Sequence, residues 1–308
     1  MVNKHLKKYL ILIGLFLISI ILTIELYSQN NLISSSELID HHTSIIHLQA
    51  LSPYKYRILS PFLIEGIIFL LPFDYEISLL ISYQIFYFIS ILLFLFVQFN
   101  YYNNWFNQSV SFFGILLSSN ALYFTFEKFG GHPWAITEVI FIVLFLDALF
   151  KNKFKLVIFV LLLASLNRET AVILPIIYFL VTKNKKNSII LFAIWLFIFV
   201  SFRLILGVEN HVISLNDIYL NNISAQSLLI LLQKLFFMFG LIVFLILISR
   251  KSIHVFHKRT IPILIPYLGL ISFWGVWVEV RLFIALLPLL IPMSLPIFSE
   301  AYKIERDN

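Results

Sequence analysis

Residues 156–182 read LVIFVLLLASLNRETAVILPIIYFLVT, an apolar run that is interrupted once, by Asn167, Arg168, Glu169 and Thr170. Lysines lie just outside both ends of the run, at positions 151, 153 and 155 and at positions 183, 185 and 186. An ionised side chain near the centre of a bilayer costs roughly 3 kcal/mol, so such groups usually face a polar cavity and serve function. The four polar residues are therefore the starting point for both the topology and the functional site.

The composition is typical of a polytopic membrane protein. Of the 308 residues, 60% are hydrophobic, only 12% are charged and 33 are Phe, and the mean hydropathy is +0.95. The longest polar stretch, residues 28–56, is too short to bury a core of its own. We therefore expect residues 1–308 to form a single transmembrane domain with an extracytoplasmic loop at 28–56. The absence of cysteine excludes disulfides, thiol catalysis and cysteine metal sites.

The first apolar segment, residues 9–27, follows three lysines and is predicted to be an uncleaved helix, because its core is too long for a signal peptide and no small-residue cleavage site follows it. Ten further apolar segments lie at 58–73, 77–99, 109–126, 134–150, 156–166, 170–182, 188–207, 225–249, 261–278 and 282–299. In lipid, backbone groups must be satisfied within each segment, which predicts an all-α fold.

The distribution of Lys and Arg predicts the topology. If all eleven segments crossed from a cytoplasmic N-terminus, three basic loops would lie outside, at 151–155, 183–186 and 250–259, against the positive-inside rule. All three loops move inside if one of the first five segments does not cross. The candidates are 58–73, which is short and bracketed by prolines, and 109–126, which carries three adjacent polar residues. Fifteen of the 22 Lys and Arg residues then face the cytoplasm.

The predicted fold is thus a transmembrane helical bundle of about ten crossings plus one re-entrant or short helix, with the N-terminus cytoplasmic. A rival topology keeps eleven crossings and places the N-terminus outside, which would make the 28–56 loop cytoplasmic. In the preferred topology the 167–170 turn lies toward the outer face, where Lys55 and Arg203 also end apolar segments.

Four cations from separate parts of the chain are predicted to meet at one depth on the outer side: Arg57, Lys128, Arg168 and Arg281. Arginine binds phosphate oxygens in a bidentate manner, and lysine adds a point charge. A lipid-linked phosphate in the outer leaflet is therefore the predicted ligand, although a solvated phosphate would satisfy the same groups.

The outer loop supplies carboxylates that could act as a general base near such a phosphate. Asp40 is the first choice, ahead of Glu37, Glu127 and Glu169. Glu169 and Glu279 are predicted to orient the arginines, and His132 to contact a sugar. Two further carboxylates, Glu65 and Glu138, lie within apolar segments and are expected either to line the cavity or to pair with arginines.

With these residues in place the chain resembles the GT-C superfamily of integral membrane glycosyltransferases. The residues that carry the resemblance are Tyr54, Tyr56, Arg57 and Pro61 at the end of the outer loop and the start of the next apolar segment, and Arg281, Pro288 and Pro292 near the last apolar run. The resemblance implies a GT-C-like fold, with Asp40 as the catalytic carboxylate. It also implies a sugar on polyprenyl phosphate as the donor. The acceptor would be a glycan, lipid or protein in polysaccharide biosynthesis at the plasma (inner) membrane. Asp40 departs from the family pattern because no acidic residue is adjacent to it.

Other functions fit the same residues. The chain could instead be a transporter or flippase for an anionic or lipid-linked substrate, or a polymerase or ligase of surface polysaccharide. Structural ion pairs with a neighbouring helix would also account for Arg168 and Glu169, and Glu279 and Arg281 could simply cap a tight outer turn. The histidines near Asp40 match no strong zinc motif, so no metal site is predicted, and the sequence leaves open whether Mg²⁺ or Mn²⁺ is a cofactor. No nucleic-acid partner is expected.

Overall fold

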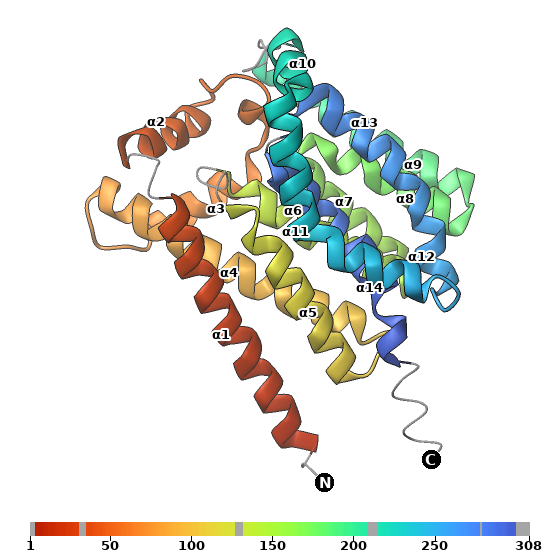
Figure 1. Ribbon diagram of the computed structural model, residues 1–308. Coiled ribbons are helices and arrows are strands. Elements are labelled where there is room, and N and C mark those ends of the chain that lie inside the picture. Colours follow the sequence, from red (N-terminus) through yellow and green to blue (C-terminus); the bar gives the residue numbers. More distant parts are fainter. Residues whose placement is uncertain (1–3, 31–34, 127–131, 209–214, 278, 300–308) are drawn as a thin grey trace, which may run out of the picture.

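The computed structural model describes residues 4–30, 35–126, 132–208, 215–277 and 279–299 (Figure 1). These residues form α-helices and short 3₁₀ helices with no strand among them, which confirms the predicted all-α fold. In chain order the helices are α1 (Lys4–Asn30), α2 (Ser35–Ile46), η1 (Tyr54–Tyr56), α3 (Leu59–Ile68), α4 (Tyr75–Tyr102), α5 (Gln108–Tyr123), α6 (Trp134–Phe150), α7 (Phe154–Asn167), η3 (Glu169–Val172), α8 (Ile173–Thr182), α9 (Lys185–Leu206), α10 (Leu215–Ile223), α11 (Ala225–Ser249), α12 (Val255–Thr260), η4 (Ile261–Ile263), α13 (Leu264–Trp274), η5 (Val280–Leu286) and α14 (Leu287–Ser294).

Five described helical segments are long and apolar enough to cross a membrane, judged by length and composition. They are Leu6–Gln29, Tyr75–Tyr102, Lys185–Leu206, Gln226–Ser249 and Val280–Ser299. Leu59–Ile68, Phe154–Asn167 and Glu169–Thr182 are shorter apolar helices. Such lengths fit a membrane protein, since about 20 apolar residues span the hydrocarbon core.

Polar residues between the apolar runs set where several helices begin. The Asn107 side chain accepts hydrogen bonds from the backbone N–H groups of Ser109 and Val110, at 3.0 and 3.1 Å, and so caps α5. Asn184 caps α9 in the same way, through the N–H of Asn187 at 3.1 Å. These caps satisfy N–H groups that a helix start leaves without a partner. The starts of α5 and α9 therefore follow from local sequence.

One end of the bundle gathers the basic turns, and we call it the lysine end. Here Lys7 Nζ donates to Ser109 Oγ at 3.2 Å, which places the start of α1 beside the start of α5. Trp105, between α4 and α5, packs on Phe150 at the end of α6, with ring centroids 4.5 Å apart. Arg259 of α12 donates to the carbonyl of Val181 near the end of α8, at 3.0 Å.

The opposite end, which we call the arginine end, gathers the turn at 167–170 and the segments around Arg57, Gly207 and Asn222. Tyr56 Oη donates to the Gly207 carbonyl at 2.8 Å, and Asn222 Nδ2 donates to the Gly275 carbonyl at 3.1 Å. Successive helices from α4 to α9 therefore run back and forth between the two ends (Figure 1).

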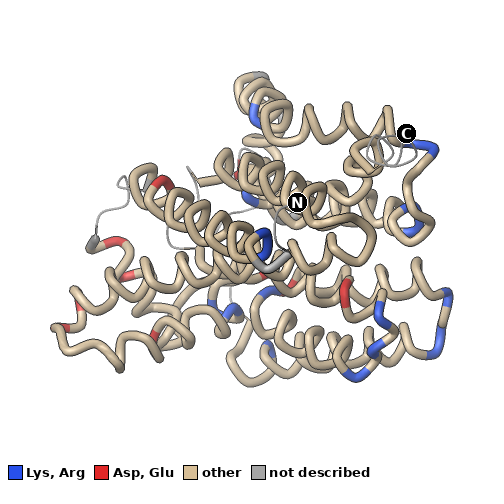
Figure 2. The backbone as a smooth tube through the Cα atoms, turned by 90° about the horizontal axis from the view of Figure 1, so that it is seen from below, with Lys and Arg blue, Asp and Glu red and all other residues tan. Residues whose placement is uncertain are grey.

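Charge is distributed unevenly around the bundle as well as along it. Seen from below the view of Figure 1, Asp and Glu gather mostly over the side formed by α2, α3 and the start of α4 (Figure 2). Lys and Arg lie mostly toward the opposite side, where α8, α9 and α12 end, and around the middle (Figure 2).

The two segments proposed not to cross differ in the structure. The 58–73 segment forms only the 10-residue helix α3, and α4 then runs to the lysine end. The 109–126 segment forms the 16-residue helix α5, which starts beside Lys7 at the lysine end. Because Arg57 precedes α3 at the arginine end, α3 turns back within the same half of the bundle, whereas α5 leads away from the lysine end.

The outer loop predicted at 28–56 contains more helix than expected. It includes the 12-residue helix α2 and the short η1, neither of which was predicted. Helix α2 is held by apolar contact, since Ile45 is fully buried in a small cluster with Ala50 and Trp134. Helix α10 was likewise not predicted, because its sequence is too polar to stand out beside the apolar runs.

Candidate functional site

Asn167 ends α7 and fixes the turn that follows. Its side chain is fully buried, and Oδ1 accepts hydrogen bonds from Ser60 Oγ and Thr137 Oγ1, each at 2.7 Å. Its Nδ2 donates to the carbonyl of Trp134 at 2.9 Å. A buried amide needs such partners, because leaving them unmade has a large desolvation cost. Asn167 therefore ties the turn to α3 and α6.

Arg168 leaves the helix with an extended backbone and points its guanidinium at α6. It forms an ion pair with Glu138, which also accepts a hydrogen bond from the Thr170 hydroxyl. The side chains of Arg168 and Glu138 are 8% and 6% exposed, so the pair is buried. Removing one member of a buried pair leaves the other charge without compensation, which is strongly destabilising.

Glu169 points the other way and pairs with Arg57, whose Nε lies 3.2 Å from Glu169 Oε2 and whose terminal nitrogen binds the second carboxylate oxygen. The guanidinium carbon of Arg57 also lies 5.5 Å from the ring centre of Tyr54 and 5.4 Å from that of Trp134. Cation–π contact of this kind holds the guanidinium in place. The Trp195 indole N–H donates to the Glu169 carbonyl at 3.2 Å.

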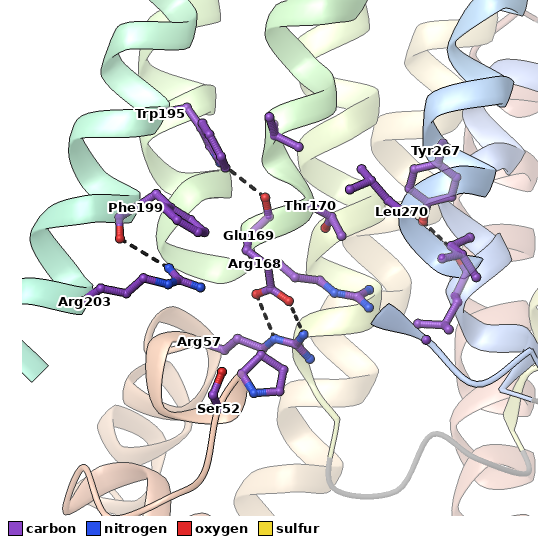
Figure 3. Close-up of a pocket in the computed structure, with 15 residues that line it drawn as sticks. Ser52, Arg57, Arg168, Glu169, Thr170, Trp195, Phe199, Arg203, Tyr267 and Leu270 are labelled. Atoms are coloured by element: carbon purple, nitrogen blue, oxygen red, sulfur yellow. Dashed lines mark hydrogen bonds and ion pairs between the residues drawn. The ribbon is translucent and has the colours of Figure 1, made fainter. Parts of the chain in front are cut away.

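A cavity of about 330 Å³ lies between this turn, α9 and α13 (Figure 3). Four charged residues are among those that line it, together with aromatic and aliphatic residues of α9 and α13. The charged residues are Arg57, Arg168, Glu169 and Arg203, and the helices contribute Trp195 and Phe199 from α9 and Tyr267, Leu270 and Ile271 from α13. The cavity is thus cationic at one side and apolar on its walls.

Arg203 differs from the other two arginines of the cavity. Its Nη1 donates to the carbonyl of Phe199 at 3.3 Å, and its guanidinium carbon lies 3.4 Å from the Phe199 ring centre and 4.5 Å from that of Tyr56. Among the described residues no carboxylate lies within ion-pair distance of Arg203. Arg57 and Arg168 are paired with Glu169 and Glu138, so within the described part of the chain Arg203 is the cavity arginine without a carboxylate partner.

The two helices that form the apolar walls lie on the outside of the bundle. Of the described residues of α9, Leu191 is the one that is buried, while Phe197 and Leu204 are 73% and 79% exposed. Ile265 of α13 is 79% exposed. One side of each helix therefore lies on the outer surface of the bundle, and the other side lines the cavity.

The predicted phosphate-binding residues are only partly brought together. Arg57 and Arg168 line the cavity, and Arg281 does not belong to its described lining. Arg281 is buried and pairs with Glu279 at 2.6 Å, while its charge interacts with Arg57 and Tyr54 nearby. Lys128 and Glu127 lie outside the described residues.

The predicted general bases lie on α2, away from the described lining of the cavity. Asp40 and Glu37 are both exposed on this helix. His132 is half-buried in a cluster of rings with His41, Tyr54 and Trp134, whose centroids lie 5.0 to 6.2 Å apart. His132 thus contacts Tyr54 and Trp134, the two rings that pack against the Arg57 guanidinium. In the described part of the chain, His, Asp and Glu side chains do not form a group of three or more that could hold a metal ion.

Sequence reasoning missed Arg203 as a site residue, although it marked Arg203 at the outer end of its segment. The missed signal is its spacing from Phe199, four residues earlier on the same helix face, which together with Trp195 forms an i, i+4, i+8 row facing the cavity. The pairing of Glu138 with Arg168 was anticipated as one of two roles for that carboxylate, whereas Glu65 pairs with His42 and with no arginine among the described residues.

Comparison of the chain with protein-family models, curated proteins and solved structures found no match. Fold and site therefore define the class directly, as an all-α bundle with helices of membrane-spanning length and an arginine-lined cavity between two peripheral helices.

Proposed function

We propose that this chain is an integral membrane glycosyltransferase that transfers a sugar from a polyprenyl phosphate donor to an acceptor on the outer face of the membrane. The observation that carries the proposal is the cavity in which Arg203, without a carboxylate partner among the described residues, lies beside the paired Arg57 and Arg168. A phosphate matches the cationic side, because arginine donors fit its oxygens. The apolar walls from α9 and α13 match an isoprenoid chain.

The proposed topology has about ten crossings, with α3 as the short helix that does not cross. The lysine end would face the cytoplasm, together with the N-terminus, and the arginine end would lie at the outer leaflet. Positive-inside bias supports this orientation, since the turns near Lys7, Lys151 and Arg259 share the lysine end. The donor lipid would then enter sideways between α9 and α13, both of which are peripheral.

In the proposed reaction the acceptor hydroxyl attacks the anomeric carbon of the sugar. The bond from that carbon to the phosphate oxygen breaks, and the polyprenyl phosphate leaves with the electron pair. Arginines positioned at the phosphate stabilise the charge that develops there. A carboxylate takes the acceptor proton as general base, the role that the resemblance to the GT-C superfamily implies for Asp40.

The decisive test is Arg203→Ala, because this substitution removes charge from the cavity without leaving a buried carboxylate unpaired. We expect the affinity for a radiolabelled polyprenyl phosphate sugar in nanodiscs to fall about 10- to 100-fold, since charge-assisted hydrogen bonds contribute about 1.5–3 kcal/mol each. Arg250→Ala is the matched control, because Arg250 is exposed at the lysine end. Equal donor affinity in the two variants would show that Arg203 does not bind the donor.

A transfer assay with the same donors and a membrane extract as acceptor separates an enzyme from a carrier. The chain has no cysteine, so Arg203→Cys gives a single thiol that can be labelled from either face in sealed vesicles. Donor consumption and labelling from the outer face alone support the glycosyltransferase. Donor binding without transfer, together with labelling from both faces, would instead favour a transporter or flippase.

A further inference from the structure

His42 on α2 is fully buried and both of its ring nitrogens have partners. Nδ1 lies 3.1 Å from Tyr83 Oη on α4, and Nε2 lies 3.0 Å from Glu65 Oε1 on α3. Tyr75 Oη donates to the same Glu65 oxygen at 3.0 Å. A single imidazole therefore joins α2 to two other helices through a closed hydrogen-bond network.

This network fits a neutral histidine. A neutral imidazole has one donor and one acceptor nitrogen, and an ionised Glu65 can only accept, so Nε2 carries the proton. The Tyr83 hydroxyl then donates to Nδ1. A second proton on Nδ1 would face that hydroxyl proton and force the hydroxyl to turn away. Burial lowers the pKa of His42 below its ordinary value of 6.5, although Glu65 opposes the shift.

The same helix also contacts the aromatic rings beside Arg57. The ring of His41 packs edge-on against Tyr54, with centroids 5.0 Å apart, and Ile45 is buried beside Trp134. Tyr54 and Trp134 are the two rings that contact the Arg57 guanidinium. The position of α2 is thus coupled to the packing around a cavity-lining arginine.

We propose that His42 is an acid-sensitive latch, which in its neutral form holds α2 against α3 and α4 and on protonation releases α2 from the bundle. Among the described residues, the titratable groups that contact His42 are Glu65 from α3 and Tyr83 from α4, with Tyr75 of α4 bound to the same carboxylate. The latch goes beyond the proposed function and stands whether the cavity serves transfer or transport.

The direction of the pH effect follows from linkage. A released α2 exposes His42 to water, where its pKa returns to about 6.5, so the released state binds more protons at acid pH. Docking of α2 is therefore strongest above pH 6.5 and weakens as the pH falls below it. The docking equilibrium loses about a factor of ten per pH unit until the pKa of docked His42 is reached.

Cysteine labelling in this cysteine-free chain measures docking without any activity assay. Ile45→Cys places a thiol at a fully buried position of the docked helix, and Gln49→Cys places one at an exposed position nearby. The labelling rate of the first with a membrane-impermeant maleimide is divided by that of the second, which cancels the pH dependence of the thiol itself. The full-length protein is used in nanodiscs.

We expect this ratio to rise between pH 7.5 and pH 5.5, by up to about tenfold. His42→Gln keeps one donor and one acceptor without a titratable group, so the ratio in that background should not change with pH. The double variant H41Q/H47Q retains His42 and should show the full rise, which keeps the test decisive even if His42→Gln fails to fold. A flat ratio in the parent chain, or a loss of the rise in H41Q/H47Q, overturns the latch.

Discussion

The two ends of the bundle treat charge in opposite ways. At the arginine end three buried arginines each have a carboxylate partner: Arg57 with Glu169, Arg168 with Glu138, and Arg281 with Glu279. At the lysine end the polar side chains that are buried are neutral, and a lysine such as Lys151 keeps 39% of its side chain exposed while pairing with Asp147.

The buried polar groups of the lysine end lie in an aromatic cluster. His257 packs on Trp105 and Tyr101, with ring centroids 4.5 and 6.2 Å apart. Among the described residues, His257 Nε2, Trp105 Nε1 and Tyr101 Oη are buried without a hydrogen-bond partner. Burial, with a smaller effect of His254, lowers the pKa of His257 to about 3, so this histidine is neutral.

The comparison shows that this chain buries charged side chains at the arginine end, where they are paired, and keeps them exposed at the lysine end. Desolvating an arginine is expensive, and a buried pair often contributes less stability than an apolar replacement would. Cations at the lysine end avoid this cost by staying in water. Two of these pairs involve arginines that line one cavity, and among the described residues Arg203 of the same cavity has no carboxylate within ion-pair distance. This arrangement is the basis for the anion-binding site proposed above.

The largest expected effect is that of breaking the best-buried pair. Arg168→Ala should lower the free energy of unfolding by about 3–5 kcal/mol, because Glu138 is left buried and charged. The double variant R168L/E138L should recover most of this loss, since it removes both charges. Thermal unfolding in detergent measures both. If the double variant is as unstable as Arg168→Ala, the charge imbalance does not cause the loss.

Next in size is the effect of Asn167→Ala, which removes three buried hydrogen bonds. Ser60 and Thr137 still bond to each other at 3.0 Å, so the cost should be on the order of 1–3 kcal/mol. Ser165→Ala is the control, because the Ser165 hydroxyl bonds only within its own helix, to the Leu161 carbonyl. Similar losses of stability in both variants would show that the turn at 167–170 is not specially fixed.

His257→Leu tests the lysine end, and here we expect stability to be kept or gained where the two preceding substitutions lose it. At pH 7.5 the stability should stay equal or rise slightly, because an unpartnered ring nitrogen is removed. As the pH falls below 6.5, unfolding of the parent chain takes up a proton on His257, so the parent loses stability that the variant keeps. The advantage of the variant should therefore reach about 1.4 kcal/mol near pH 5.5. A pH-independent difference in melting temperature would contradict this account.

Lys151→Ala should have the smallest effect. Lys151 pairs with Asp147 four residues earlier on the surface, at 2.7 Å, and exposed pairs of this kind contribute about 0.3–0.5 kcal/mol. The loss should shrink further in high salt, because exposed charges are screened. A loss comparable to that of Arg168→Ala would erase the contrast between the two ends.

Much of the fold could be predicted from the sequence, because apolar runs and the residues that end them are local features. The break at 167–170 and the separation of lysines from the polar turn both appear in the sequence. Helix α2 could not be predicted in this way. It depends on the burial of Ile45 and His42 against residues that are distant in the chain.

The candidate site could be predicted only in part, for a similar reason. Arg57 and Arg168 stand out as cations at the ends of apolar runs, but their neutralisation depends on Glu169 and Glu138. The resemblance placed the general base at Asp40, which lies exposed on α2, outside the described lining of the cavity. This assignment stays a prediction.

The sequence by itself determined an all-α architecture and the position of Arg57, Arg168, Arg203 and Arg281 at the ends of apolar runs, because hydropathy and turn chemistry act over a few residues. Only the tertiary structure decided which cavity arginine lacks a carboxylate partner among the described residues. Compensation depends on distances of a few ångströms between helices, and those distances place carboxylates beside Arg57 and Arg168 but surround the guanidinium of Arg203 with Phe199 and Tyr56.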